Sequence, residues 1–490
     1  MKVGRTLLMV IILGMVFNSQ RLLAQTFSVL HAFTADNVSS TNLDGAYPQA
    51  GLVLAGNTLY GTASAGGTNK LGTVFSIATD GSAFAVLHTF AGTNLVNAEG
   101  AAPKGTLAFS GNILYGAASD GGTNDSGTLF SIATDGSGFT VLHTFATNAF
   151  NAELQETNAD GAYPNSLTLA SDGTLYGTAN EGGTNGYGTI FSINTNGTGF
   201  TVLHAFDVLD GENPQGGLLL WGGTLYGTAR NGGTNRYGAI FSINTSGANF
   251  ARLHSFSALL NGTNLEGGYP EGGLAQSGDT FYGAASEGGT NGNGTLFSLD
   301  TNGENFTVLH TFTPSYGVTN FDGTEPEGTL LLAGNTLYGT AAFGGTNQWG
   351  TVFSVNTNGS GFNTLYAFAH VQFATNSGGV EPETGVILSG GTLYGTAHFG
   401  GNAYGTVFSL AIVPAIASFN LLGTNLELNA TNGVAGETCF VLASADLTLP
   451  LSQWTPVTTN VLSTGGNFTI TATNAVNLAV PRQFYTLQVQ

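Results

Sequence analysis

Short runs in which apolar and polar residues alternate recur along most of the chain, separated by glycine-bearing turns. The first unit has four of them, at Gly51 to Leu54, Thr58 to Ala63, Thr73 to Ile77 and Phe84 to Phe90. Alternation with a period of two is typical of β-strands. We therefore expect a unit of four short strands and an all-β fold.

The four-strand unit recurs seven times. Its second strand carries Leu-Tyr-Gly, or Phe-Tyr-Gly in one copy, and the tyrosines are spaced by 55, 61, 50, 56, 56 and 56 residues. This period suits one blade of a β-propeller and exceeds the turn of a β-helix. The tyrosines are Tyr60, Tyr115, Tyr176, Tyr226, Tyr282, Tyr338 and Tyr394.

The repeat is offset at its two ends. Phe27 to Phe33 reads as a fourth strand with no first three before it, and the last unit stops after its third strand at Leu410. This offset predicts that the N-terminal strand completes the last blade, with Val29 beside Val407, and closes a ring without exposed end faces. We expect a seven-bladed β-propeller over residues 26–411, in which an aromatic side chain of one blade fills the space beside glycine or alanine on the next.

Two segments lie outside the repeats. Residues 1–24 have Lys2 and Arg5 ahead of an apolar run of 11 residues, and read as a secretory signal peptide with Ala24 at the cleavage point. The run is too short to span a bilayer, so we expect a secreted, extracellular or cell-surface protein with no transmembrane segment after signal removal. For residues 415–490 we expect a small β-sandwich, with Trp454, Phe440 and Phe484 as candidates for its core. It would serve as a sorting or attachment domain, or else as a passive module.

Charge and cysteine content exclude several classes of partner and cross-link. Removal of residues 1–24 would leave 6 Lys and Arg against 29 Asp and Glu, a net charge of −23. No basic stripe remains to neutralise phosphates, so we expect no nucleic-acid partner. Cys439 is the single cysteine, which excludes an intramolecular disulfide, and we expect it to be buried in a strand.

The expected strand order places the loops after the second and fourth strands at one end of the ring. An acid followed by glycine precedes the proline of six units, and loop carboxylates are ligands that calcium prefers. Calcium is therefore the one cofactor that the sequence suggests. The simpler interpretation is that acid-glycine pairs before a strand are ordinary turn residues. The acids are Asp44, Glu99, Asp160, Asp210, Glu266 and Asp322, and Gly378 takes this place in the seventh unit.

A histidine occupies six of the seven fourth strands, and Tyr366 takes the place of the seventh. Side chains spread around a ring cannot converge on one metal ion. We therefore expect hydrogen bonding or aromatic packing from these residues rather than catalysis. They are His31, His88, His143, His204, His254 and His310.

Positions that break the repeat are better candidates for ligand binding. Arginine or aromatic side chains on loops of small residues can stack on a sugar or anchor a partner, although scattered exposed aromatic residues are also normal on protein surfaces. The candidates are Arg230, Arg236, Phe343, Trp349, His398 and Phe399.

Three runs of the first unit carry a family resemblance. Leu-Tyr-Gly-Thr at Leu59 to Thr62, Gly-Gly-Thr-Asn at Gly66 to Asn69 and Gly-Thr-Val-Phe-Ser at Gly72 to Ser76 have counterparts in all seven units. With them the chain resembles the GloVer tandem-repeat family of bacterial secreted proteins. The resemblance implies export and surface display, and brings no catalytic residues.

The leading functional hypothesis is a non-catalytic, monomeric binding protein whose loop-bearing face contacts an extracellular glycan, a protein or a cation. No nucleophile elbow, zinc motif, P-loop or dinucleotide fingerprint occurs in its required context, so we assign no catalytic residues. The alternative is a secreted polysaccharide-active hydrolase or lyase. It requires acids that depart from the repeat to converge at the channel mouth, such as Glu153, Glu156, Asp207, Asp210 and Glu212.

Overall fold

The computed structural model describes residues 26–34, 42–92, 97–151, 155–314, 320–369, 378–434, 436–446, 448–462, 466–476 and 483–489. The predicted signal peptide and Glu153 lie outside these ranges. Within them the protein is all-β, apart from one short 3₁₀ helix at Leu451–Gln453. Among these residues no helix has the length and apolar character needed to cross a membrane.

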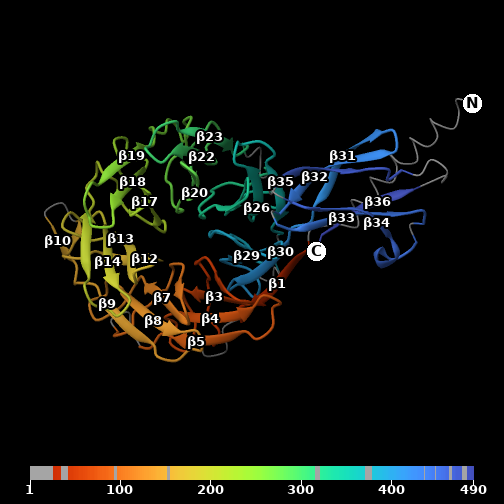
Figure 1. Ribbon diagram of the computed structural model, residues 1–490. Helices are drawn as coiled ribbons and strands as arrows, with labels where there is room; N and C mark the ends of the chain where they lie inside the picture. The colour runs from red at the N-terminus through yellow and green to blue at the C-terminus, as the bar shows by residue number, and fades with distance from the viewer. Residues whose placement is uncertain are drawn as a thin grey trace, which may run out of the picture.

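The described repeats form seven four-stranded antiparallel sheets arranged around a common centre (Figure 1). We number the sheets in chain order. Sheet 1 has β2 (Val53–Ala55), β3 (Thr58–Ala63), β4 (Thr73–Ala78) and β5 (Ala85–Thr89); sheet 2 has β6 (Ala108–Ser110), β7 (Ile113–Ala118), β8 (Thr128–Ala133) and β9 (Thr140–Thr144). Sheet 3 has β12 (Ala162–Leu169), β13 (Thr174–Glu181), β14 (Thr189–Asn194) and β15 (Thr201–Ala205); sheet 4 has β16 (Leu219–Trp221), β17 (Thr224–Ala229), β18 (Ala239–Asn244) and β19 (Ala251–Ser255). Sheet 5 has β20 (Ala275–Ser277), β21 (Thr280–Ala285), β22 (Thr295–Asp300) and β23 (Thr307–Thr311); sheet 6 has β24 (Leu331–Ala333), β25 (Thr336–Ala341), β26 (Thr351–Asn356) and β27 (Asn363–Ala367). A two-stranded ribbon, β10 (Ala149–Phe150) and β11 (Glu156–Thr157), lies between sheets 2 and 3 in the chain.

Sheet 7 combines the two ends of the repeat region. It contains β28 (Ile387–Ser389), β29 (Thr392–Ala397), β30 (Thr406–Ala411) and, beside β30, the N-terminal strand β1 (Phe27–Ala32). Val29 lies opposite Phe408, and His31 lies opposite Val407, because a β-bulge separates Val29 from His31. The expected Val29–Val407 register is therefore wrong by one residue.

Hydrogen bonds link neighbouring sheets near the centre. Gly51 N donates to Thr106 Oγ1 at 3.1 Å between sheets 1 and 2. Sheet 7 contacts sheet 1 in a similar way, since Thr396 Oγ1 donates to Ala50 O at 3.2 Å. At the periphery of this contact Tyr47 N donates to Tyr404 O at 2.8 Å. The first and last sheets of the chain are thus direct neighbours.

The glycine of the Leu-Tyr-Gly signature accommodates a phenylalanine of its own sheet. Gly61 pairs with Phe75 across β3 and β4, and a Cβ at Gly61 would lie 2.6 Å from Phe75 Cζ. Of the two predicted partners, glycine is therefore wrong, whereas alanine is confirmed, since Tyr60 clusters with Ala118 of the next sheet. Tyr60, on the opposite face, does reach the next sheet, where it packs with Leu107 and Leu114.

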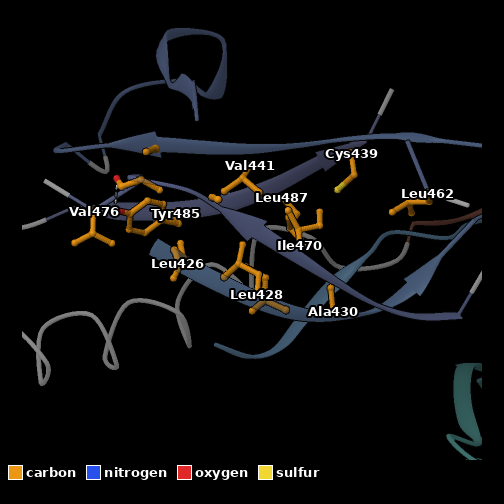
Figure 2. Packing of buried hydrophobic residues seen from close by; sticks show 14 residues of the cluster. Leu426, Leu428, Ala430, Cys439, Val441, Leu462, Ile470, Val476, Tyr485 and Leu487 are labelled. Carbon is orange, nitrogen blue, oxygen red and sulfur yellow. Dashed lines mark hydrogen bonds between the residues drawn. The ribbon is translucent and has the colours of Figure 1, made fainter. Parts of the chain in front are cut away.

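The C-terminal segment forms two three-stranded sheets that enclose one apolar cluster. One sheet has β31 (Ala415–Leu422), β32 (Asn425–Gly433) and β35 (Gly466–Ala472), and the other has β33 (Thr438–Ser444), β34 (Thr455–Val461) and β36 (Phe484–Val489). Figure 2 shows Leu426 and Leu428 from the first sheet facing Val441 and Leu487 from the second.

Of two predictions for this segment, one is confirmed and one is wrong. Cys439 lies fully buried in the cluster as a free thiol, as predicted. Trp454, Phe440 and Phe484 do not belong to this core, because they pack with Leu442 in a separate small cluster. Alternation explains the difference, since Leu442 and Val441 point to opposite faces of β33.

Candidate functional site

The loops after the second and fourth strands of each unit share one end of the assembly. Residues just before the first strand pair with residues just after the second, as in the bridges Ala46–Ala65 and Thr324–Phe343. These bridges hold the variable loops against the short loops that carry Gly-Gly-Thr-Asn. Any ligand that approaches this end meets side chains from both kinds of loop.

At this end the residue that follows the proline of each unit lines one central cavity of about 480 Å³, which we call the mouth cavity. We call these seven side chains the mouth ring. They are Gln49, Lys104, Asn165, Gln215, Glu271, Glu327 and Glu383. A second cavity of about 420 Å³ continues from it along the backbone of the first strands, past residues such as Gly51, Gly217 and Gly385.

The residue before each of these prolines has a left-handed backbone. A residue that precedes proline normally adopts an extended conformation, and left-handed backbone costs a non-glycine residue about 1–3 kcal/mol. Neighbouring sheets hold the strain in place: Glu381 N, for example, donates to Trp349 O at 3.1 Å. The residues are Tyr47, Ala102, Tyr163, Asn213, Tyr269, Glu325 and Glu381, with φ from 51° to 59°.

The acids of the mouth ring are concentrated on sheets 5, 6 and 7. Arg230 Nε lies 3.0 Å from Glu271 Oε1, and His398 Nδ1 lies 2.6 Å from Glu383 Oε1. Glu327 lies between these pairs in the order of the sheets. Burial, reinforced by repulsion from Glu271 and Glu383, raises the pKa of Glu327 to about 8. Glu327 therefore carries a proton near neutral pH.

The other side of the mouth cavity has mixed chemistry. Burial raises the pKa of Asp120, which Lys104 partly offsets, and burial together with Glu156 raises the pKa of Tyr163 to about 12. The Tyr163 hydroxyl donates to Glu156 Oε2 at 3.4 Å. Asn180 Oδ1, also at the cavity, accepts no hydrogen bond from any described residue. This side offers an aromatic ring and polar groups to a ligand.

The six residues predicted from breaks in the repeat occupy different places. Arg230 and His398 contact mouth-ring carboxylates, and the Phe399 ring stacks on His398 at 3.9 Å. None of the six is among the residues that line the mouth cavity. Arg236 is exposed with a left-handed backbone, and Phe343 and Trp349 are half-buried beside sheet 6. Arg236, Phe343 and Trp349 remain predictions as ligand contacts.

The six acids considered for calcium each pair with the fourth-strand histidine of the preceding sheet. The nitrogen–oxygen distances run from 2.9 Å in His143–Asp160 to 3.5 Å in His254–Glu266. The pairs are His31–Asp44, His88–Glu99, His143–Asp160, His204–Asp210, His254–Glu266 and His310–Asp322. Because each pair lies at the junction of a different two sheets, the six carboxylates do not gather at one place. Calcium at any of them remains a prediction.

Each pair also links parts of the structure to one another. Burial alone would raise the pKa of Asp44, but hydrogen bonds from His31 and Thr34 outweigh it and lower this pKa below 3.8. The His31 ring stacks on Phe84 of the next sheet at 3.6 Å. Burial lowers the pKa of His88, which stacks on Phe139 in the same way. The histidines thus contact both their own loop and the neighbouring sheet.

The acids named for the enzymatic alternative do not line the mouth cavity in the described part of the chain. Asp210 pairs with His204, Asp207 accepts the N–H of Leu209, and only Glu156 reaches a lining residue, Tyr163.

The acids at or beside the mouth are instead Asp120, Glu181, Glu271, Glu325, Glu327, Glu381 and Glu383, which the sequence reasoning missed. A signal was present, because Glu-Pro-Glu occurs in two consecutive units. The proline shared by all units indicates the start of the first strand, and by itself it does not indicate a site.

Comparison with known proteins identifies the repeat. Residues 13–158 and 146–321 match the family described as the Gloeobacter/Verrucomicrobia repeat, which together is more than half of the chain. A search of curated proteins finds no match.

Solved structures with similar folds have low identity to the chain. A chain of the nidogen/laminin complex is 15% identical, with a TM-score of 0.36, over 60% of this chain and 90% of its own. TolB from Acinetobacter baumannii is 14% identical, with a TM-score of 0.35, over 59% and 58%. An oligogalacturonate lyase in complex with manganese is 10% identical, with a TM-score of 0.45, over 79% and 96%. The activities of these proteins are not transferred to this chain.

Proposed function

We infer that this chain, which belongs to the Gloeobacter/Verrucomicrobia repeat family, is a closed seven-bladed β-propeller over residues 26–411 that binds an extracellular glycan at the mouth cavity. The seven four-stranded sheets, the pairing of β1 with β30 and the Thr396–Ala50 hydrogen bond support the closed ring. Each is what a ring without free end sheets requires.

The observation that carries the binding proposal is the divergence of the mouth ring. The seven units share their core tyrosine, glycine and phenylalanine, yet the residue after the proline varies among glutamine, lysine, asparagine and glutamate. Structural constraint on a repeat would keep this position uniform. A single asymmetric ligand on the central axis would require each unit to present a different group.

The chemistry of the mouth favours a hydroxyl-rich ligand. Carboxylates and amides accept or donate hydrogen bonds to sugar hydroxyls, and the half-buried ring of Tyr163 can stack on a sugar face. The formal net charge of −20 disfavours polyanions. A neutral or amine-bearing glycan therefore fits this site best.

Export and attachment complete the proposal. Residues 1–24 would direct secretion, and residues 415–490 would serve as a sorting or attachment domain on the cell surface. In that arrangement the monomeric propeller would present its mouth to extracellular polysaccharide.

The test is a glycan array probed with the chain from residue 26 onward, followed by calorimetry on the glycans that bind. Glu327→Ala should weaken binding at least tenfold, because Glu327 lines the mouth cavity. The control is Glu304→Ala, since Glu304 is exposed in the turn after β22 and does not line that cavity. Equal losses in both variants, or no glycan bound by the wild type, would refute the proposal.

Glu327 also supports the enzymatic alternative. A carboxylic acid that stays protonated near neutral pH, beside other carboxylates, can donate a proton to a leaving glycosidic oxygen. The same glycans should then yield shortened products with the wild type and none with Glu327→Gln. Binding without product formation would exclude this alternative.

A further inference from the structure

Sheet 7 brings two carboxylates and an imidazole together beside the mouth cavity. Glu381, Glu383 and His398 each offer one ligand atom, and these atoms lie within 4.8 Å of one another. We propose that these three residues bind a divalent first-row transition metal ion, with Zn²⁺ and Mn²⁺ as the representative ions. The site shares Glu383 with the mouth ring, but the inference does not depend on glycan binding.

The backbone fixes the three side chains relative to one another. Glu381 and Glu383 flank Pro382, whose ring restrains the local chain, and Glu381 has the left-handed φ of 57°. His398 directly follows β29, and its N–H donates to Glu381 O at 3.0 Å. The cluster therefore rests on a strand end and a proline rather than on a long loop.

Neighbouring residues hold the ligand side chains in place. The His398 ring stacks on Phe399, and the edge of Tyr47 meets it at a centroid distance of 5.5 Å. Gln49 Nε2 donates to Glu383 Oε2 at 3.3 Å. Contacts of this kind around ligating residues orient them and strengthen metal binding.

One imidazole with two carboxylates suits ions that accept both nitrogen and oxygen ligands, such as Zn²⁺ and Mn²⁺. The side chains of His398 and Glu383 are 14% and 23% exposed, so an ion can reach them. His398 Nδ1 and Glu383 Oε1 are 2.6 Å apart and share a hydrogen bond. The ion would replace the proton of that bond, and three protein ligands leave further coordination positions open.

The surrounding charge favours a cation. Glu325 of the adjacent sheet 6 adds a further carboxyl group beside the cluster, the protonated Glu327 brings no positive charge, and the nearby Arg230 is already paired with Glu271. A bound dication would relieve this crowding of like charges.

Sheet 6 supplies an internal control for the proposal. It carries the same Glu-Pro-Glu arrangement, with Glu325 and Glu327, but Ala342 takes the place of His398 after the second strand. If the imidazole is essential, sheet 6 does not hold the ion and sheet 7 does. Ala342→His should then create a second site.

The experiment is calorimetric titration of the chelator-treated chain from residue 26 onward with Zn²⁺ and with Mn²⁺. We expect one tight site per chain in the wild type, at least tenfold weaker binding in His398→Ala and Glu383→Gln, and unchanged binding in His88→Ala. Ala342→His should raise the stoichiometry to two. Circular dichroism and thermal melting confirm that each variant is folded.

Several results would overturn the proposal. Wild-type protein that binds neither Zn²⁺ nor Mn²⁺ would do so, as would folded His398→Ala protein that binds them as tightly as the wild type. If the wild type and His398→Ala bound Ca²⁺, Zn²⁺ and Mn²⁺ with equal affinity, the binding would come from an acidic surface and not from a transition-metal site. These outcomes are independent of the glycan array, because the titration uses no glycan.

Discussion

Thr396 Oγ1 donates a hydrogen bond to the carbonyl oxygen of Ala50 at 3.2 Å, across 346 positions of the chain. It joins sheet 7 to sheet 1 near the axis, while β1 pairs with β30 at the outer edge of sheet 7. The two ends of the repeat region therefore meet both at the centre and at the periphery. The N-terminal strand therefore contributes to the contacts between the first and last sheets of the repeat region.

Loss of the side chain at the end of β1 should destabilise the protein as strongly as the same loss inside the repeats. Phe33 has 0% exposure and packs against Phe75 of sheet 1. Phe33→Ala should lower the free energy of unfolding by about 3–5 kcal/mol. Phe256→Ala, at the same place in sheet 4, provides the comparison in denaturant titrations. A loss below about 1 kcal/mol for Phe33→Ala alone would show that β1 contributes little.

The signature glycine should resist enlargement for steric reasons. A Cβ at Gly227 would lie 2.6 Å from Phe241 Cζ and 2.9 Å from a methyl group of Leu218. Gly227→Ala should therefore cost about 1–3 kcal/mol. Gly217→Ala is the matched control, since its nearest contact would be 3.5 Å from Ser166 and neither glycine has a positive φ. A lower melting temperature for Gly217→Ala than for Gly227→Ala would contradict this packing.

Acid should remove the contribution of the buried Asp322 to stability. Burial would raise the pKa of Asp322, but hydrogen bonds from His310 and Thr313 outweigh it and lower this pKa below 3.8. A lowered folded-state pKa gives stability that is present above the unfolded value and lost as pH falls through the folded value. The difference in free energy of unfolding between the wild type and Asp322→Asn should therefore be largest above pH 4 and should become smaller as the pH falls below 4. Denaturant midpoints across this range provide the measurement, and a gap independent of pH would contradict the prediction.

Glu327 should have the opposite effect to Asp322 on how stability changes with pH. Its folded pKa of about 8 exceeds its ordinary value of 4.5, so the folded state binds more protons between these values. Wild-type stability should decline as pH rises through this window, and Glu327→Gln should lack that decline. Above pH 8 the variant should melt at a higher temperature than the wild type, whereas near pH 4 the two should agree. Parallel melting profiles would show that Glu327 is ionised in the folded protein.

Calcium should not stabilise the protein through the six histidine-paired acids. Six of the seven units contribute one such carboxylate each, and oxygens such as those of Asp322 already accept hydrogen bonds, so too few ligands remain for Ca²⁺. We expect an unchanged melting temperature on addition of Ca²⁺ to His398→Ala, which lacks the proposed transition-metal site. A rise with Ca²⁺ concentration would instead support calcium at the loops, because ligands that bind the folded state raise its stability.

The candidate site was only partly predictable, because its members are adjacent in space and not in sequence. Arg230 and His398 stood out as departures from the repeat, and both lie at the mouth. Glu327 belongs to one of two Glu-Pro-Glu runs, but a glutamate after proline fits a strand start equally well, so this run alone does not indicate a site. Its raised pKa arises from burial and from Glu271 and Glu383, which neighbouring sheets bring to the same cavity.

By itself the sequence determined the unit: four strands, their turns, the seven copies and the displaced N-terminal strand follow from local alternation and from the Leu-Tyr-Gly period. Only the tertiary structure decided which side chains meet. The bulge at Val29 shifts the register by one residue, and Phe75 packs over Gly61 of its own sheet. The physical reason is that strand formation depends on neighbours a few residues away, whereas the mouth cavity and its charges depend on how seven separate sheets converge on one axis.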